Sequence, residues 1–507
     1  MRFSRAGHRV VFGLFLAAVA VIAFETGARA GNAPDNRGAQ LPAQPYVDPR
    51  PVGSFPTSNA RIQAWIAANQ TDSIRRHGWD IWASITAPAY PTQPISPMVP
   101  TWQTWYSGHE LFEMASGETK RHARAVHGLL AIEPVALNAH LPRMLVRGAN
   151  GIPYNPYERV FAFNRFSRSG AEYIWKNQLN SGDTLMARFQ RLLANSTPLA
   201  SLELLTSADS TDSLQFVLKP VFQFISGKEV TAIPVWDGHG ANATSVPGNP
   251  TPETWRHAVA VDPSGRYKAG DSVYLPINND TARWLKVVPL SAFYWVRVTT
   301  QDSVNFTRFG AENGDFIGLA NDTSYQAVMN AVRPGNIGLL MAMHVTGKEI
   351  PNWTWQSFWW SLDPKDSTTG RDRPKSIRAP WNHYDMTVTY SMVTPAGDSV
   401  IGFNPYLETS LGGSIPNSLT GTDSTPWTGI STNCMSCHRR AGVNWVGANF
   451  VAPPYGPDMN IAAGDSLVFT QPNPAGSGRV PVLKTDFLWS VAIRASSPTY
   501  ARARKKP

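Results

Sequence analysis

The sequence has little cysteine and, after its first 30 residues, no long hydrophobic run. Only two of its 507 residues are cysteine, so a structural zinc site built from two cysteine pairs is excluded. No later segment reaches the ~18 consecutive apolar residues that a transmembrane helix needs. Glycine-rich nucleotide-binding, His-Glu-x-x-His and Gly-x-Ser-x-Gly motifs are also missing, which leaves those classes of enzyme without support.

The remaining composition is that of a folded chain with many turns. Hydrophobic residues make up 42% of the sequence, which argues against disorder, and 41 prolines with 39 glycines disfavour a long-helix bundle. The net charge is +9, but four arginines lie within residues 1–30 and four basic residues within 502–506. Without these two ends the net charge is only about +2, so we expect no nucleic-acid partner.

Residues 1–30 have the three parts of a secretory signal peptide. Met1–Arg9 is basic, Val10–Phe24 is apolar, and Ala28-Arg29-Ala30 is a small-x-small cleavage site. The alternative is an uncleaved anchor. We expect cleavage, no integral membrane span in the processed chain, and a periplasmic or secreted location.

Apolar spacing predicts helices over residues 58–85, 169–180 and 184–194. Ser58 or Asn59 is the expected cap of the first helix, and Thr71 or Asp72 that of a second one. Short β-branched or aromatic runs between turn residues predict strands. These runs are 214–218, 222–225, 230–236, 257–261, 273–277, 293–299, 337–345, 353–360 and 386–392, with a further helix at 322–332.

These patterns predict a mainly β fold with some α, built on an antiparallel sandwich or barrel-like sheet. A few N-terminal helices and a loop-rich C-terminal region complete the expected fold. The expected regions are a signal peptide (1–30), an extended arm (31–57), a helical and loop-rich region (58–200), a β-rich domain (201–400), a C-terminal region packed on the β-rich body (401–497) and a basic tail (498–507).

Both cysteines lie in one short motif. Cys434 and Cys437 are separated by two residues, and His438 follows at once. This is the attachment pattern of a c-type haem, in which two thiols bond to two vinyl groups and the histidine ligates iron. A thioredoxin-like pair, a zinc site and a plain disulfide are weaker alternatives. The motif predicts one covalent haem c in the 401–497 region, outside the cytoplasm.

Three strings around this motif are similar to those of a known group of proteins. They are residues 343–355 (MHVTGKEIPNWTW), residues 403–408 (FNPYLE) with 433–441 (NCMSCHRRA), and residues 484–490 (KTDFLWS). The chain resembles exported bacterial cytochrome c family proteins over about residues 60–495. The resemblance implies covalent haem at Cys434 and Cys437 with His438 as ligand. It implies no substrate or partner.

The sixth iron ligand decides what such a haem does, because an open position binds small molecules and a filled one favours electron transfer. Met459 is the only methionine after the motif, and it lies in a proline-bearing loop. His344, in an apolar run, is the main alternative as distal ligand or base, and otherwise a core residue. His383 is a weaker candidate.

Two further groups of residues are predicted near the haem. Arg439 and Arg440 follow the ligand histidine and suit the haem propionates, unless they are solvated charges. The tryptophans either pack in the core or wall the haem. They are Trp353, Trp355, Trp359 and Trp360.

We therefore expect an exported monohaem cytochrome that passes single electrons to an exported redox partner protein. The alternative is a haem enzyme or gas sensor with an open distal site, such as a peroxidase-like oxidoreductase. A third reading is a β-rich binding module that uses the haem as an electron port.

Overall fold

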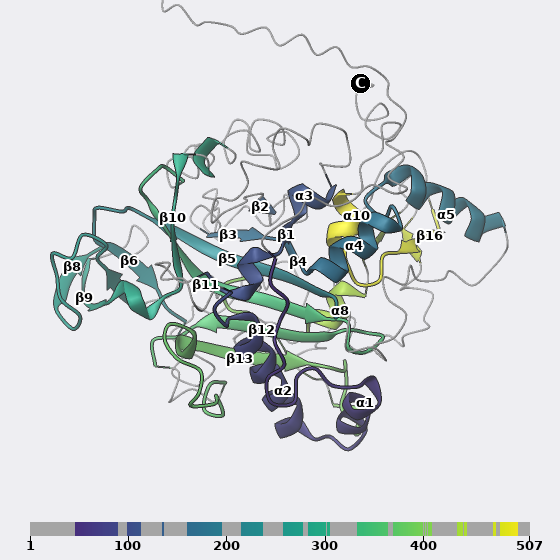
Figure 1. Ribbon diagram of the computed structural model, residues 1–507, viewed down its shortest axis with the longest axis horizontal. Coiled ribbons are helices and arrows are strands. Elements are labelled where there is room, and N and C mark those ends of the chain that lie inside the picture. The colour runs from purple at the N-terminus through teal and green to yellow at the C-terminus, as the bar shows by residue number, and fades with distance from the viewer. Residues whose placement is uncertain are drawn as a thin grey trace, which may run out of the picture. The chain divides into compact units, whose positions relative to one another are not determined.

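The structure is a computed structural model, and its largest element is an open antiparallel sheet of nine strands (Figure 1). It describes residues 46–89, 99–112, 134–135, 160–194, 214–236, 257–276, 282–300, 302–304, 332–363, 369–398, 400, 402, 404–407, 433–439, 441–443, 470–472 and 477–494.

The nine strands run in the order β1-β4-β5-β11-β12-β13, with β3 also paired to β5, β2 to β3, and β10 to β11. All these pairs are antiparallel. The bounds are β1 Tyr106–Ser107, β2 Pro134–Val135, β3 Val160–Phe163, β4 Arg165–Phe166, β5 Phe216–Ile225, β10 Trp295–Arg297, β11 Ile337–Gly347, β12 Thr354–Trp360 and β13 Tyr384–Thr389.

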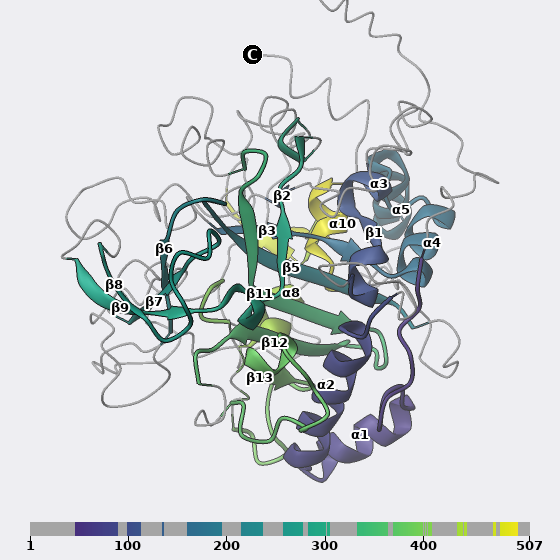
Figure 2. The same cartoon turned by 60° about the vertical axis from the view of Figure 1, so that its left-hand side comes forward.

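A second sheet of four strands has the order β6-β7-β9-β8, and β7 and β9 are parallel (Figure 2). Among the described strands no sheet closes into a barrel. The prediction of a mainly β fold with some α in antiparallel sheets is confirmed. The remaining strands are β6 Thr231–Pro234, β7 Ala258–Val261, β8 Ser272–Leu275, β9 Arg283–Val288, β14 Gly442–Val443, β15 Thr470–Pro472, β16 Arg479–Pro481 and β17 Leu483–Lys484.

The predicted helices are confirmed where they fall on described residues. Ser58 caps α1 by accepting from the Arg61 amide, as expected, whereas α2 begins after Gln70, which makes no side-chain cap. The 322–332 helix lies outside the described residues. The helices are α1 Asn59–Ala67, α2 Thr71–Ile85, α3 Gly108–Phe112, α4 Arg168–Lys176, α5 Gly182–Ala194, α8 Cys434–His438 and α10 Trp489–Arg494, with 3-10 turns at Thr101–Thr104, Leu290–Ala292 and Trp381–His383. None of these described helices is long and apolar enough to cross a membrane.

The main sheet buries both of its faces, and β12 shows how. Successive strand residues point to opposite faces. Phe358 stacks on Trp82 of α2 with ring centroids 4.1 Å apart, which defines the α2 face. Trp355, three residues earlier, contacts His438 of α8, which defines the opposite face, here called the α8 face. The helix α8, which contains the cysteine motif, and the helix α2 therefore lie on opposite sides of β12.

Candidate haem-attachment site

The cysteine motif forms its own short helix, α8, against the sheet. Cys434 and Met435 are buried, with 9% and 3% of their surface exposed. They belong to an apolar cluster that includes Trp353 and Trp355 from the start of β12, together with Leu488. Cys437 lies in α8, and its side chain is outside the described part of the structure. Positions three and four apart on a helix share one side, so residues 434, 437 and 438 fall together on α8.

A hydrogen bond orients the imidazole ring of His438. Its Nδ1 lies 2.8 Å from the carbonyl oxygen of Phe487. A carbonyl only accepts, so Nδ1 carries the proton and Nε2 keeps its lone pair. This is the tautomer that a histidine needs to bind iron through Nε2, with the second nitrogen fixed by a carbonyl. The donor set of His438 therefore fits a haem iron.

The environment of His438 also favours the neutral, metal-binding form. Burial lowers the pKa of the imidazole to about 3, and the charges of His344 and Lys219 lower it further, while the Phe487 hydrogen bond acts in the opposite direction. The Trp355 ring lies on the same imidazole, with centroids 4.5 Å apart. A ligand histidine must be neutral to bind a metal. Because His438 is already neutral at neutral pH, no proton has to be removed before a metal binds.

His344 lies on the same face of the sheet as His438. It pairs with Lys219 of β5 and Ser357 of β12, and Ser357 is two residues from Trp355 on the α8 face. His344 is the single half-buried residue in an otherwise buried β11. Its charge is close enough to act on His438. The structure thus brings together two of the predicted iron-site histidines, without fixing a ligand role for the second.

His383 lies on the other side of the sheet. Its ring stacks on Trp360 at an interplanar angle of 16°. Trp360 is two residues beyond Phe358 and shares its α2 face. His383 is therefore separated from His438 by the sheet.

The predicted arginines and methionine have different outcomes. Arg439 is buried, and its Nη1 lies 3.1 Å from the Met392 sulfur, while its carbonyl accepts from Lys484. Its pairing with a propionate stays a prediction. Arg440 and Met459 lie outside the described residues.

The tryptophans divide between two core clusters. Trp353 and Trp355 belong to the cluster that contains Cys434, whereas Trp359 and Trp360 belong to the larger core cluster. Only the first two therefore pack with the attachment motif. Of the four, Trp355 has its ring on the proposed ligand itself.

Sequence reasoning missed the loop that holds His438. Residues 485–488, here called the proximal loop, supply the Phe487 carbonyl. Asp486 in this loop is bound by Lys348 from the turn between β11 and β12, at 2.8 and 3.0 Å. The sequence signal was limited to Lys348 and Asp486 themselves, and no local pattern could have paired them across 138 residues.

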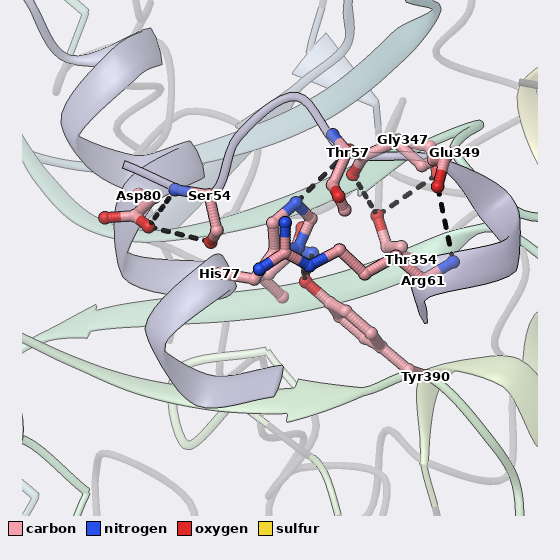
Figure 3. Close-up of polar contacts among 11 residues, drawn as sticks. Ser54, Thr57, Arg61, His77, Asp80, Gly347, Glu349, Thr354 and Tyr390 are labelled. Carbon is pink, nitrogen blue, oxygen red and sulfur yellow. Dashed lines mark hydrogen bonds and ion pairs between the residues drawn. The ribbon is translucent and has the colours of Figure 1, made fainter. Parts of the chain in front are cut away.

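A separate buried polar network lies on the α2 face (Figure 3). His77 Nδ1 is 2.6 Å from the Tyr390 hydroxyl, and Nε2 is 3.2 Å from the Glu349 carboxylate. Gln356 donates to the Tyr390 oxygen at 3.0 Å. Within the described residues no group of three or more His, Cys, Asp and Glu side chains could hold a metal ion. This network fastens α2 to the sheet.

Comparisons of the chain with protein-family models, curated proteins and solved structures found no match.

Proposed function

We propose that the chain is an exported monohaem c-type cytochrome that transfers single electrons. The observation that carries the proposal is the pairing of the Cys-x-x-Cys-His helix with the Phe487 carbonyl. The motif supplies two thiols and an imidazole, and the carbonyl fixes that imidazole with Nε2 as the binding atom. A random cysteine pair would have no need of such an orienting contact.

Cys434 and Cys437 would tether the haem. Each thiol adds across one vinyl group: its sulfur bonds to one vinyl carbon and its hydrogen goes to the other, with no leaving group. His438 would then bind the iron through Nε2. The bound haem supplies reversible one-electron chemistry.

The protein's own part is to fix the ligand and exclude water from it. Trp355 is 2% exposed and covers the imidazole, and Trp353 and Leu488 extend the same apolar cluster. Burial and hydrogen bonds around a ligand set the potential of an iron centre. These residues would therefore tune when the iron accepts an electron. The electron must come from, and go to, an exported redox partner.

The second candidate is a haem enzyme or gas sensor with an open distal position. Half-burial of His344 on the α8 face favours this candidate, since a distal histidine at an open iron site can act on a bound small molecule. A single haem supplies one electron, so two-electron chemistry would need a second source.

Optical spectra separate the two candidates. We would record ferric and ferrous spectra, with and without carbon monoxide, on chain matured with a haem-attachment system. Electron transfer predicts a low-spin ferrous spectrum that carbon monoxide leaves unchanged. An open site predicts a high-spin spectrum that shifts with carbon monoxide, and that result would replace the first candidate by the second.

Variants then name the sixth ligand. Loss of the ferric methionine–iron band in Met459→Ala would identify Met459, and conversion to high spin in His344→Ala would identify His344. Thr387 is half-buried and pairs with Ser357 on the same face as His344. Thr387→Ala is therefore the matched control and should leave the spectrum unchanged.

A further inference from the structure

The proximal loop has a backbone that needs an external hold. Asp486 and Phe487 have φ values of 47° and 66°. Residues with a Cβ atom enter this left-handed region at an energetic cost, and keep it only where surrounding contacts determine it. Phe487 is the residue whose carbonyl accepts from His438. The strained backbone and the contact with His438 therefore occur at the same residue, Phe487.

The side chain of Asp486 supplies that hold. Lys348 Nζ lies 3.0 Å from its Oδ1 and 2.8 Å from its Oδ2, and the Trp353 indole nitrogen donates to Oδ2 at 3.2 Å. The side chains of Lys348 and Asp486 are only 3% and 4% exposed. Breaking such a pair would leave a buried charge uncompensated. The side chains of Lys348 and Asp486 therefore stay paired.

The turn that carries Lys348 is anchored from both faces of the sheet. Its Nζ also donates to the Pro351 carbonyl at 2.7 Å, which closes the turn between β11 and β12. The next residue, Glu349, is fully buried on the α2 face. There it accepts from the Thr57 amide at 3.3 Å and from the Thr354 hydroxyl at 3.4 Å (Figure 3). The turn is thus a rigid base for the contact with Asp486.

The proximal loop is also tied to the chain that follows His438. The Thr485 amide donates to the Ala441 carbonyl at 3.1 Å, and its hydroxyl donates to the Leu488 carbonyl at 2.9 Å. These contacts hold the ends of the loop. The contacts of Asp486 hold its middle, where the Phe487 carbonyl is aimed, together with the packing of the Phe487 ring against Trp355 at a centroid distance of 6.1 Å.

We infer that Asp486 and Lys348 are positioning residues for the iron ligand: their buried ion pair holds the Phe487 carbonyl against His438 Nδ1 and so fixes the tautomer and ring plane of the imidazole. This inference rests on the proposed function. A purely stabilising role would not need an ion pair here, because apolar residues of similar volume often stabilise a core as well.

The test is Asp486→Asn in the haem-loaded chain, with electron paramagnetic resonance and reduction potential as readouts. Loss of the carbonyl contact makes the imidazole a weaker donor to ferric iron. We therefore expect altered ferric g values and a higher potential. Lys348→Arg, which keeps the charge and the donors, should stay close to wild type.

The chain offers a control with the same kinds of partner, although its carboxylate is 35% exposed where that of Asp486 is 4% exposed. Asp372 is likewise bound by one cation, Arg75, at 2.6 Å and by one tryptophan nitrogen, that of Trp79, at 3.1 Å. Asp372→Asn should lower stability while leaving the g values and the potential unchanged. If Asp486→Asn lowers stability and also leaves them unchanged, Asp486 is merely structural and the inference is wrong.

Two further variants guard against ambiguous outcomes. The double variant Lys348→Met with Asp486→Asn removes both charges, so a potential shift that persists there comes from geometry rather than from lost charge. If Asp486→Asn does not fold, Trp353→Phe removes only the indole donor to the same carboxylate. It should shift both readouts in the same direction by less, and an unshifted folded variant would contradict the inference.

Failure of the proposed function is distinguishable from failure of this inference. Absence of attached haem in the wild-type chain would end the proposed function. The nitrogen chemical shifts of His438 in the haem-free chain would still report the tautomer. The inference predicts the Nδ1–H form in wild type and its loss in Asp486→Asn, and a tautomer unaffected by the substitution would contradict it.

Discussion

At the scale of single residues, Trp355 is the side chain that most directly links packing to the chemistry of His438. Its ring covers the imidazole, and its nitrogen donates to the Asn352 carbonyl at 2.9 Å. A buried tryptophan contributes both apolar burial and one satisfied polar group. It therefore stabilises the fold and shields the His438 imidazole from water.

Trp355→Ala should destabilise the chain by about 3–5 kcal/mol, the usual cost of emptying a large aromatic site in a core. In the haem-loaded chain the potential should also fall, because water that enters the space favours the more highly charged ferric iron. Urea unfolding and redox titration would measure the two effects. Trp355→Phe, which keeps most of the ring, should retain most of the potential, and an equal fall in both variants would contradict the water-exclusion argument.

Asp372 gives a residue-scale prediction for acid. Burial raises its pKa, but the hydrogen bonds and charge of Arg75 and the Trp79 donor outweigh burial, so the pKa lies below its ordinary value. A lowered pKa stabilises the fold above the unfolded value of ~3.9 and loses that contribution as pH falls through the folded value.

Wild type should therefore be more stable than Asp372→Asn at neutral pH, by up to about 1 kcal/mol, because solvent screens a carboxylate that is 35% exposed. The gap should shrink below about pH 4. Denaturant unfolding at a series of pH values would measure it. A gap that stays constant down to pH 2 would contradict the pairing.

At the scale of elements, close contact between α2 and β13 depends on Gly78. A Cβ atom at this position would lie 2.7 Å from Val388 Cγ1 and 2.8 Å from the Met386 sulfur. Glycine inside a helix costs about 0.5–1 kcal/mol relative to alanine. Here the cost is offset by the approach of the helix to the strand.

Gly78→Val should therefore lower the free energy of unfolding by about 1–3 kcal/mol, as overpacking does in a core. Denaturant titration would measure the loss. Gln63→Val, at an exposed position of α1, is the control and should have a much smaller effect. Equal losses would mean that valine lowers stability through helix propensity alone.

Sequence patterns predicted where individual strands lie better than which strands pair with one another. The strands at 337–345 and 353–360 are confirmed as β11 and β12 because buried, β-branched and aromatic runs leave little choice. The runs 214–218 and 222–225 form one strand, β5. Pro220 lies between the two runs, and pairing with β11 along the whole length of β5 makes them one strand.

The candidate site was predictable only where its residues are adjacent in sequence. The motif at Cys434–His438 is local and could be recognised from spacing alone. The contacts of His438 with Trp355 and Phe487 join residues far apart in the chain. Strand register and a left-handed loop bring them together, and neither can be derived from composition or periodicity.

At the scale of the whole molecule, the two faces of the main sheet have different surroundings. Its α2 face buries a fully packed network around His77 and a stack of aromatic rings. Its α8 face carries α8, the proximal loop and the half-buried His344. The turn that contains Lys348 and Glu349 joins the two faces. The surroundings of His77 and those of His438 are thus joined through one turn of the main sheet.

The central claim is covalent haem at Cys434 and Cys437. The most direct measurement is the intact mass of the chain purified from cells that export it and attach haem. The account predicts an added mass of one haem, retained after denaturation and lost in the Cys434→Ser, Cys437→Ser double variant. Purified wild-type chain without this added mass, in cells that mature another c-type cytochrome normally, would contradict the account.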